Sequence, residues 1–170
     1  SVIVQGSKNA ALPMMAASLL HRGVSVLRGC PRITDVYCME EILKKLGAVS
    51  RWEGKDLYLD CTWADGTEIS GDSTGRMRSS VILLGAMLGR SGRGTVGYPG
   101  GCVIGKRPVD IHVFALRCLG VSVQEKENGI TARRLRPAGG TVVFPKKRVG
   151  ATEQAVLSSV LSDGETVLKN

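Results

Sequence analysis

The sequence predicts an α/β fold made of repeated β-α-β-α-β-β units, with the helices buried inside and the sheets outside. First, a loop of small residues with a nearby cation opens an apolar helix three times, in residues 6–20, 78–88 and 148–161. Second, a glycine and a β-branched strand follow each helix at intervals of about 70 residues, which indicates internal repetition. Third, an amphipathic helix and a hairpin lie between these segments. The turning glycines are Gly23, Gly94 and Gly164.

The amphipathic helix of the first unit is predicted to begin where Thr34 and Asp35 offer an N-cap. Apolar residues at positions 36, 39, 43 and 46 then fall on one helical face. Glu40 and Lys44 form an i,i+4 pair, which indicates that the opposite face is exposed to solvent. The matching helix of the second unit opens at Asp110. Its apolar face is predicted to contain Ile111, Phe114, Ala115, Cys118 and Leu119.

Turn signals place a hairpin at the end of each unit. The first hairpin turns within residues 53–56, and the second turns at Asn128 and Gly129, a pair typical of tight hairpins. Residues 81–88 are apolar on nearly all sides, so we expect this helix to be buried all round.

The repeats divide the chain into residues 1–71, 72–140 and 141–170. The third repeat stops after its first helix and strand, and the chain begins at Ser1 without an initiator methionine. We therefore expect one incomplete domain of about two and a half repeats.

Composition limits the partners. The net charge of +8 and the pI near 9.5 favour an anionic partner, either nucleic acid or a small phosphorylated metabolite. Only 4% of the residues are aromatic and they do not alternate with basic ones, which argues against nucleic acid. No run of about 18 apolar residues is present, so no membrane partner is expected.

The cysteines and histidines point to a reduced, metal-free protein. The five cysteines form no C-x-x-C pair, and no secretory signal is visible, so we expect a cytoplasmic protein with free thiols. His21 and His112 stand apart from any cluster with metal-ligand spacing, so no metal is expected. His112, at the start of a helix, fits either a ligand-orienting residue or one that satisfies the helix end.

One cysteine lies in a setting suited to chemistry. Cys102 is part of a loop, residues 99–108, that contains three glycines and is bounded by prolines. The neighbouring Lys106 and Arg107 would favour its thiolate form. A half-buried thiol that fills a turn is the alternative.

The three apolar helices open beside cations. Lys8 and Asn9 stand at the first opening, Arg78 at the second, and residues 146–148 precede Gly150 at the third. Helix N-termini attract phosphate and carboxylate groups, so openings brought together by the repeat would form one anion site. Taken singly, each cation also fits a solvated surface residue.

The motifs GSKNAALP (residues 6–13), MRSS (77–80), GGCVIG (100–105), RPVDIH (107–112) and VGAT (149–152) resemble, in order and spacing, the UDP-N-acetylglucosamine 1-carboxyvinyltransferase family of enolpyruvyl transferases. This resemblance covers the whole chain. It implies the inside-out α/β barrel of that family, with two domains of three repeats each and a cleft between them. The chain would then be an incomplete catalytic domain, and its partner would be the second domain of the same protein.

The resemblance also implies roles for individual residues. Lys8 and Asn9 would bind phosphoenolpyruvate, and Arg107 would help to hold its phosphate. Cys102 would donate a proton to the methylene carbon of phosphoenolpyruvate, and it would be the residue that fosfomycin alkylates. No cofactor is implied.

UDP-N-acetylglucosamine would be the second substrate. Its implied contacts are Arg78, Arg107, Pro108, Val109, Asp110, Ile111, Lys146, Lys147, Arg148, Val149 and Gly150. Arg148 stands where family members usually have a small hydroxyl residue, and Lys106 where a small residue is common.

Two alternatives follow from the same motifs. The shikimate-pathway enolpyruvyl transferase shares the fold and the phosphoenolpyruvate chemistry but lacks the Gly-Gly-Cys loop, so Cys102 argues against it. A non-catalytic protein or fragment that binds a sugar nucleotide is the other. Since the family's general-base aspartate lies in the second domain, we expect the chain by itself to be inactive.

Overall fold

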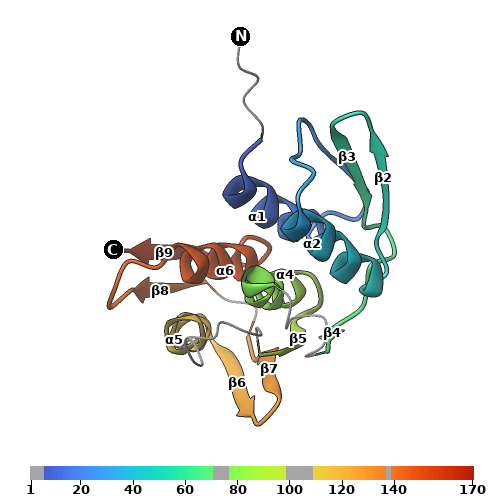
Figure 1. Ribbon diagram of the computed structural model, residues 1–170. Helices are drawn as coiled ribbons and strands as arrows, with labels where there is room; N and C mark the ends of the chain where they lie inside the picture. The colour runs from blue at the N-terminus through green and yellow to red at the C-terminus, as the bar shows by residue number, and fades with distance from the viewer. Residues whose placement is uncertain (1–5, 71–76, 99–108, 137–138) are drawn as a thin grey trace. The chain divides into compact units, whose positions relative to one another are not determined.

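The computed structural model describes residues 6–70, 77–98, 109–136 and 139–170 (Figure 1). The chain divides into two compact units, Ser1–Gly66 and Thr67–Asn170, which are described one at a time. Within the described residues, no helix is long and apolar enough to cross a membrane. The predicted boundary between residues 71 and 72 lies outside the described residues, and the division into three repeats stays a prediction.

The first unit follows the predicted order of elements. They are α1 (Lys8–Ser18), β1 (Val24–Leu27), α2 (Thr34–Lys45), β2 (Val49–Glu53) and β3 (Asp56–Asp60). The strands form an antiparallel sheet in the order β1-β3-β2. The hairpin between β2 and β3 turns at Gly54, which has a φ of 57°, so the predicted turn is confirmed. Leu57 and Leu59 on β3 are fully buried.

The start of α2 differs from the prediction. Helix α2 begins at Thr34, its N-cap is Ile33, and no side chain forms a capping hydrogen bond there. The backbone amides of Val36 and Tyr37 donate to the carbonyl of Ile33 instead. The Thr34–Asp35 capping prediction is therefore wrong. Asp35 still lies in the first turn, where its negative charge interacts favourably with the positive end of the helix dipole.

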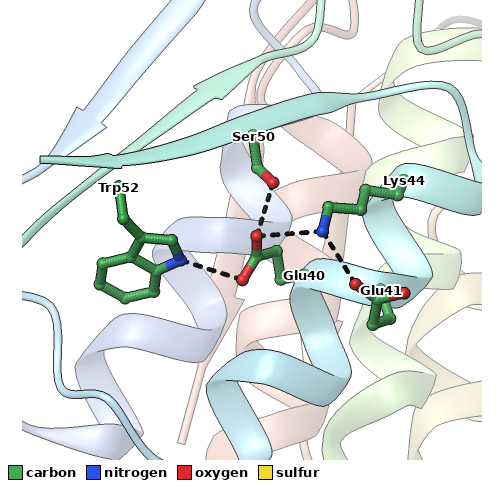
Figure 2. A network of polar contacts seen from close by, with 5 residues as sticks. All are labelled: Glu40, Glu41, Lys44, Ser50 and Trp52. Carbon is green, nitrogen blue, oxygen red and sulfur yellow. Dashed lines mark hydrogen bonds and ion pairs between the residues drawn. The ribbon is translucent and has the colours of Figure 1, made fainter.

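Glu40 is the second difference, because its side chain is buried and not solvated. Only 6% of Glu40 is exposed, whereas its neighbour Glu41 is an exposed residue. Figure 2 shows the Glu40 carboxylate between Lys44 and two side chains of β2. Ser50 Oγ donates to Oε1 at 2.6 Å and Trp52 Nε1 donates to Oε2 at 3.1 Å. The predicted Glu40–Lys44 pair forms at 3.3 Å, but on a face that the hairpin covers.

The second unit carries the rest of the helices and strands that the structure describes. Its elements are β4 (Glu68–Ile69), η1 (Arg78–Val81), α4 (Ile82–Ser91), β5 (Arg93–Gly97), α5 (Asp110–Cys118), β6 (Val121–Lys126), β7 (Gly129–Arg134), β8 (Gly140–Val143), α6 (Val149–Ser159) and β9 (Thr166–Lys169). From β4 to β7 the α-helices and strands follow the predicted β-α-β-α-β-β order. The sheet order β5-β7-β6 also repeats the β1-β3-β2 order of the first unit.

Parallel strand pairs flank two of the buried helices. Strand β4 pairs in parallel with β5 and strand β8 pairs in parallel with β9, and α4 and α6 are the respective crossover helices. Such β-α-β connections need a helix to carry the chain back along the sheet. The two helices pack against each other (Figure 1).

Helix α4 is buried all round, as predicted. Every residue from Ile82 to Leu88 is buried, and burial of each large aliphatic side chain contributes about 1.5–3 kcal/mol. The helix ends at Gly92, which adopts the left-handed conformation with a φ of 70°. The predicted turn at Gly94 is wrong, because Gly94 lies inside β5, where a Cβ would stand 3.0 Å from Met87 Cβ.

Helix α5 buries a narrower face than expected. Ile111, Ala115 and Leu119 belong to a core cluster, as the spacing predicts. Phe114 and Cys118 do not, since Phe114 is 40% exposed and Cys118 is an exposed free thiol. Helix α5 is oriented about its axis so that the side carrying residues 111, 115 and 119 packs against α6 and β8. Phe114 and Cys118 lie outside that packed side.

Candidate functional site

The openings of α5 and α6 lie together in the second unit. A single hydrophobic cluster anchors both helices against β8. Its buried members are Ile111, Ala115, Leu119, Val142, Phe144, Ala151 and Ala155. Because Ile111 is in the first turn of α5 and Ala151 is in the first turn of α6, this cluster positions both helix starts. The predicted nucleotide-binding segments, residues 109–111 and 146–150, are therefore neighbours.

The segment before α6 presents three cations to solvent. Lys146, Lys147 and Arg148 are all exposed. Arg148 is the N-cap residue of α6, and its carbonyl accepts hydrogen bonds from the amide of Thr152 at 3.0 Å and from Thr152 Oγ1 at 3.1 Å. A helix start with adjacent positive side chains suits a phosphate or diphosphate group.

A side-chain hydrogen bond joins the two helices directly. His112 Nδ1 is bonded to Oε1 of Gln154, which is 1% exposed. Burial lowers the pKa of His112, although the bond to Gln154 and the charge of Asp110 act to raise it. Because the amide oxygen of Gln154 can only accept, Nδ1 of His112 is the donor in this hydrogen bond. Gln154 was not identified from the sequence, where a polar residue on an apolar helix gives no sign of its partner.

The predicted phosphoenolpyruvate residues open α1 in the first unit. Lys8 and Asn9 are exposed at the start of the helix. Lys8 Nζ forms an ion pair with Asp35 Oδ2 at 2.9 Å, and the side chains of the two residues are 50% and 37% exposed. Asp35 lies in the first turn of α2, so this pair joins the openings of the two helices.

Several predicted site residues cannot be placed from the described part of the chain. Cys102, Arg107 and Pro108 lie outside the described residues, as does Lys106. The backbone of Arg78 begins η1, directly before α4. A common hollow shared by Lys8, the η1 opening and the α6 opening stays a prediction.

Metal binding finds no support in the described residues. Outside residues 1–5, 71–76, 99–108 and 137–138, no group of three or more His, Cys, Asp or Glu side chains could hold a metal ion. Cys30, Cys38, Cys61 and Cys118 are free thiols.

Comparison with known proteins places the chain among enolpyruvyl transferases. The family model described as EPSP synthase (3-phosphoshikimate 1-carboxyvinyltransferase) matches residues 1–170. A UDP-N-acetylglucosamine 1-carboxyvinyltransferase 2 of Caldanaerobacter subterraneus is 40% identical over 169 residues, which cover 99% of this chain and 40% of the relative. A UDP-N-acetylglucosamine 1-carboxyvinyltransferase of Thermus thermophilus is 45% identical over 166 residues, covering 98% of this chain and 39% of the relative.

The fold comparison agrees. The crystal structure of the enolpyruvyl transferase NikO from Streptomyces tendae has a TM-score of 0.72 and 21% identity, covering 92% of this chain and 36% of that one. The predicted enolpyruvyl transferase fold is thereby confirmed. The chain spans about 40% of the length of the curated relatives that it matches. On the strength of the full-length family match and the shared fold, the chain belongs to the EPSP synthase family of enolpyruvyl transferases.

Proposed function

We propose that the chain is part of an enzyme that transfers the enolpyruvyl group of phosphoenolpyruvate to the 3-hydroxyl of UDP-N-acetylglucosamine and releases phosphate. This is the first committed step of peptidoglycan synthesis. The observation that carries the proposal is the 36–45% identity, over nearly the whole chain, to relatives named UDP-N-acetylglucosamine 1-carboxyvinyltransferase. Since the chain spans about 40% of those relatives, the activity is proposed for the longer protein.

The second unit would bind the sugar nucleotide. Residues 109–111 at the α5 opening would contact it beside the cationic segment before α6. Lys146 and Arg148 would balance the negative charge of the diphosphate, and the unpaired amides at the start of α6 would donate to it. The charged Arg148 would add a charge-assisted, bidentate contact to phosphate, where a small hydroxyl residue offers a single neutral hydrogen bond.

The first unit would bind phosphoenolpyruvate. Lys8 would hold its phosphate, and the ion pair with Asp35 would keep the lysine side chain over the opening of α1 until the substrate arrives. Asn9, in the same turn, would add a hydrogen bond. Arg107 would complete the phosphate site, by resemblance to the family.

The reaction would be an addition followed by an elimination. The Cys102 thiol gives its proton to C3 of phosphoenolpyruvate, and the sugar 3-hydroxyl attacks C2 while losing its own proton to a base. The tetrahedral adduct then loses a proton from C3 and expels phosphate, which leaves the enolpyruvyl ether. Cations around the phosphate and carboxylate would stabilise the charge that develops, and positioned proton transfer adds to the rate.

Phosphate release tests the proposal. With both substrates present, a protein of the relatives' full length that carries these 170 residues is expected to release phosphate, and the 170-residue chain alone is expected to release none above background. The physical reason is that the general base and the remaining phosphoenolpyruvate arginines would come from the second domain. Turnover by the chain alone would contradict the requirement for a second domain, and an inactive full-length protein would contradict the function.

Fosfomycin labelling separates an enzyme from a non-catalytic nucleotide-binding protein. We expect one covalent adduct in the full-length protein, located at Cys102 by peptide mass spectrometry. Cys102→Ala should abolish the adduct, whereas the matched variant Cys118→Ala, which removes an exposed thiol, should retain it. A Cys102 that resists labelling would favour the non-catalytic alternative.

A further inference from the structure

The hydrogen bond between His112 and Gln154 connects the first turn of α5 to α6. His112 lies in the first turn of α5, and Gln154 lies in the second turn of α6, 42 residues further along the chain. Both helix starts carry segments of the proposed nucleotide site. The hydrogen bond therefore spans the place where those two segments meet.

Gly150 lies beside the imidazole ring. A Cβ at Gly150 would stand 3.5 Å from His112 Cε1 and 3.7 Å from Nε2, both ordinary van der Waals distances. The ring thus lies against the first turn of α6, and the branches of a larger side chain at position 150 would meet it. His112 is thus near α6 at Gly150 and is hydrogen-bonded to it at Gln154.

Helix α4 packs closely against the backbone of Gln154. A Cβ at Gly85 would stand 2.5 Å from the Gln154 carbonyl oxygen, so the backbones of α4 and α6 approach closely at this level. The Gln154 side chain is buried, and its amide nitrogen has no hydrogen-bond partner among the described residues. His112 is therefore the group that orients this amide within the described part of the chain.

We propose that His112 is a positioning residue: through Gln154 it fixes the first turn of α6 against the first turn of α5, so that residues 109–111 and 146–150 present one surface to the sugar nucleotide. This inference rests on the proposed function, because it names a residue that arranges the nucleotide site without touching the substrate. Nδ1 of the imidazole, and not the ring as a whole, carries the effect.

The test uses the 170-residue chain with UDP as the probe. Nuclear magnetic resonance titration should shift the amides of residues 109–111 and 149–151 together. His112→Ala should weaken UDP binding about tenfold, since one hydrogen bond is worth about that factor. His112→Asn keeps an N–H donor near the position of Nδ1 and should stay within about threefold of the unmodified chain. His21→Ala, which removes an exposed histidine from the first unit, is the matched control.

Amide hydrogen exchange supplies a second readout that needs no ligand. The Thr152 amide, bonded to the Arg148 carbonyl, should exchange about tenfold faster in His112→Ala, and α4 amides should be unchanged. Equal loss of protection in α4 and α6 would reduce His112 to a general stabilising residue and overturn the proposal, as would unchanged exchange at Thr152.

Together, the UDP titration and the hydrogen-exchange measurement show whether the positioning role of His112 or the nucleotide assignment has failed. If UDP does not bind the unmodified chain while Thr152 exchange responds to His112→Ala and recovers in His112→Asn, the positioning of α6 stands and the nucleotide assignment fails. If UDP binds equally well to the unmodified chain and to His112→Ala, the positioning proposal is wrong and the proposed function is unaffected.

Discussion

Removal of the Glu40 carboxylate is expected to lower the free energy of unfolding of the first unit by about 3 kcal/mol. In Glu40→Ala, the Ser50 hydroxyl and the Trp52 indole N–H lose their acceptor, and Lys44 loses one of two carboxylate partners. Polar groups left unpaired in a partly buried place still cost free energy beyond the loss of the hydrogen bonds themselves. Urea unfolding followed by tryptophan fluorescence measures this unit, because both tryptophans, Trp52 and Trp63, lie in it.

The matched control is Glu41→Ala. Glu41 pairs with the same Lys44 at 2.8 Å, but its side chain is 66% exposed, so its loss should cost under about 0.5 kcal/mol. An equal decrease in the free energy of unfolding for Glu40→Ala and Glu41→Ala would contradict a special stabilising role of the buried Glu40 carboxylate.

The same carboxylate makes the first unit sensitive to acid. Burial acts to raise the pKa of Glu40, but hydrogen bonds from Ser50, Trp52 and Lys44, with the charge of Lys44, lower it overall. A lowered folded-state pKa stabilises the fold above the unfolded value of about 4.3, and that stability is lost as pH falls through the folded pKa. Unfolding free energies from about pH 5 down to about pH 3 should therefore fall less steeply in Glu40→Gln. Parallel curves would contradict the assignment.

Gly85→Ala is expected to lower the free energy of unfolding of the second unit by about 2 kcal/mol. The added Cβ would stand 2.5 Å from the Gln154 carbonyl oxygen and 2.9 Å from Gln154 Cγ, so α4 and α6 must move apart. Overpacking of this kind costs up to about 3 kcal/mol, and the better helix propensity of alanine offsets about 1 kcal/mol of it. Urea unfolding followed by circular dichroism, with hydrogen exchange at α4, measures the loss.

Gly150→Ala serves as the control for this helix packing. It introduces the same methyl group into α6, where the Cβ would meet His112 at 3.5 Å without a clash. We expect its free energy of unfolding to stay within about 0.5 kcal/mol of the unmodified chain, or to rise slightly. Similar losses for both glycine variants would contradict close backbone packing at Gly85.

The candidate site could be predicted from the sequence to different extents. The family resemblance assigned residues 109–111 and residues 146–150 to one substrate, and the structure places the openings of α5 and α6 against one hydrophobic cluster. Gln154 could not be predicted, because its only signal is a polar residue within an apolar helix. The roles of Cys102 and Arg107 stay predictions, since both lie outside the described residues.

The sequence by itself determined the order of helices and strands and the repeat of that order. The signals that predict these elements are local. They are apolar residues at helical or strand spacing, Gly54 and the Asn128–Gly129 turn, and each acts over a few neighbouring residues. Their effect can therefore be predicted without knowing the tertiary structure. The burial of Glu40, the ending of α4 at Gly92 and the bond between His112 and Gln154 were decided only by tertiary structure. Each of these features depends on a segment that is distant in sequence and packs against the residue in question. The local spacing of residues carries no information about which distant segment that is.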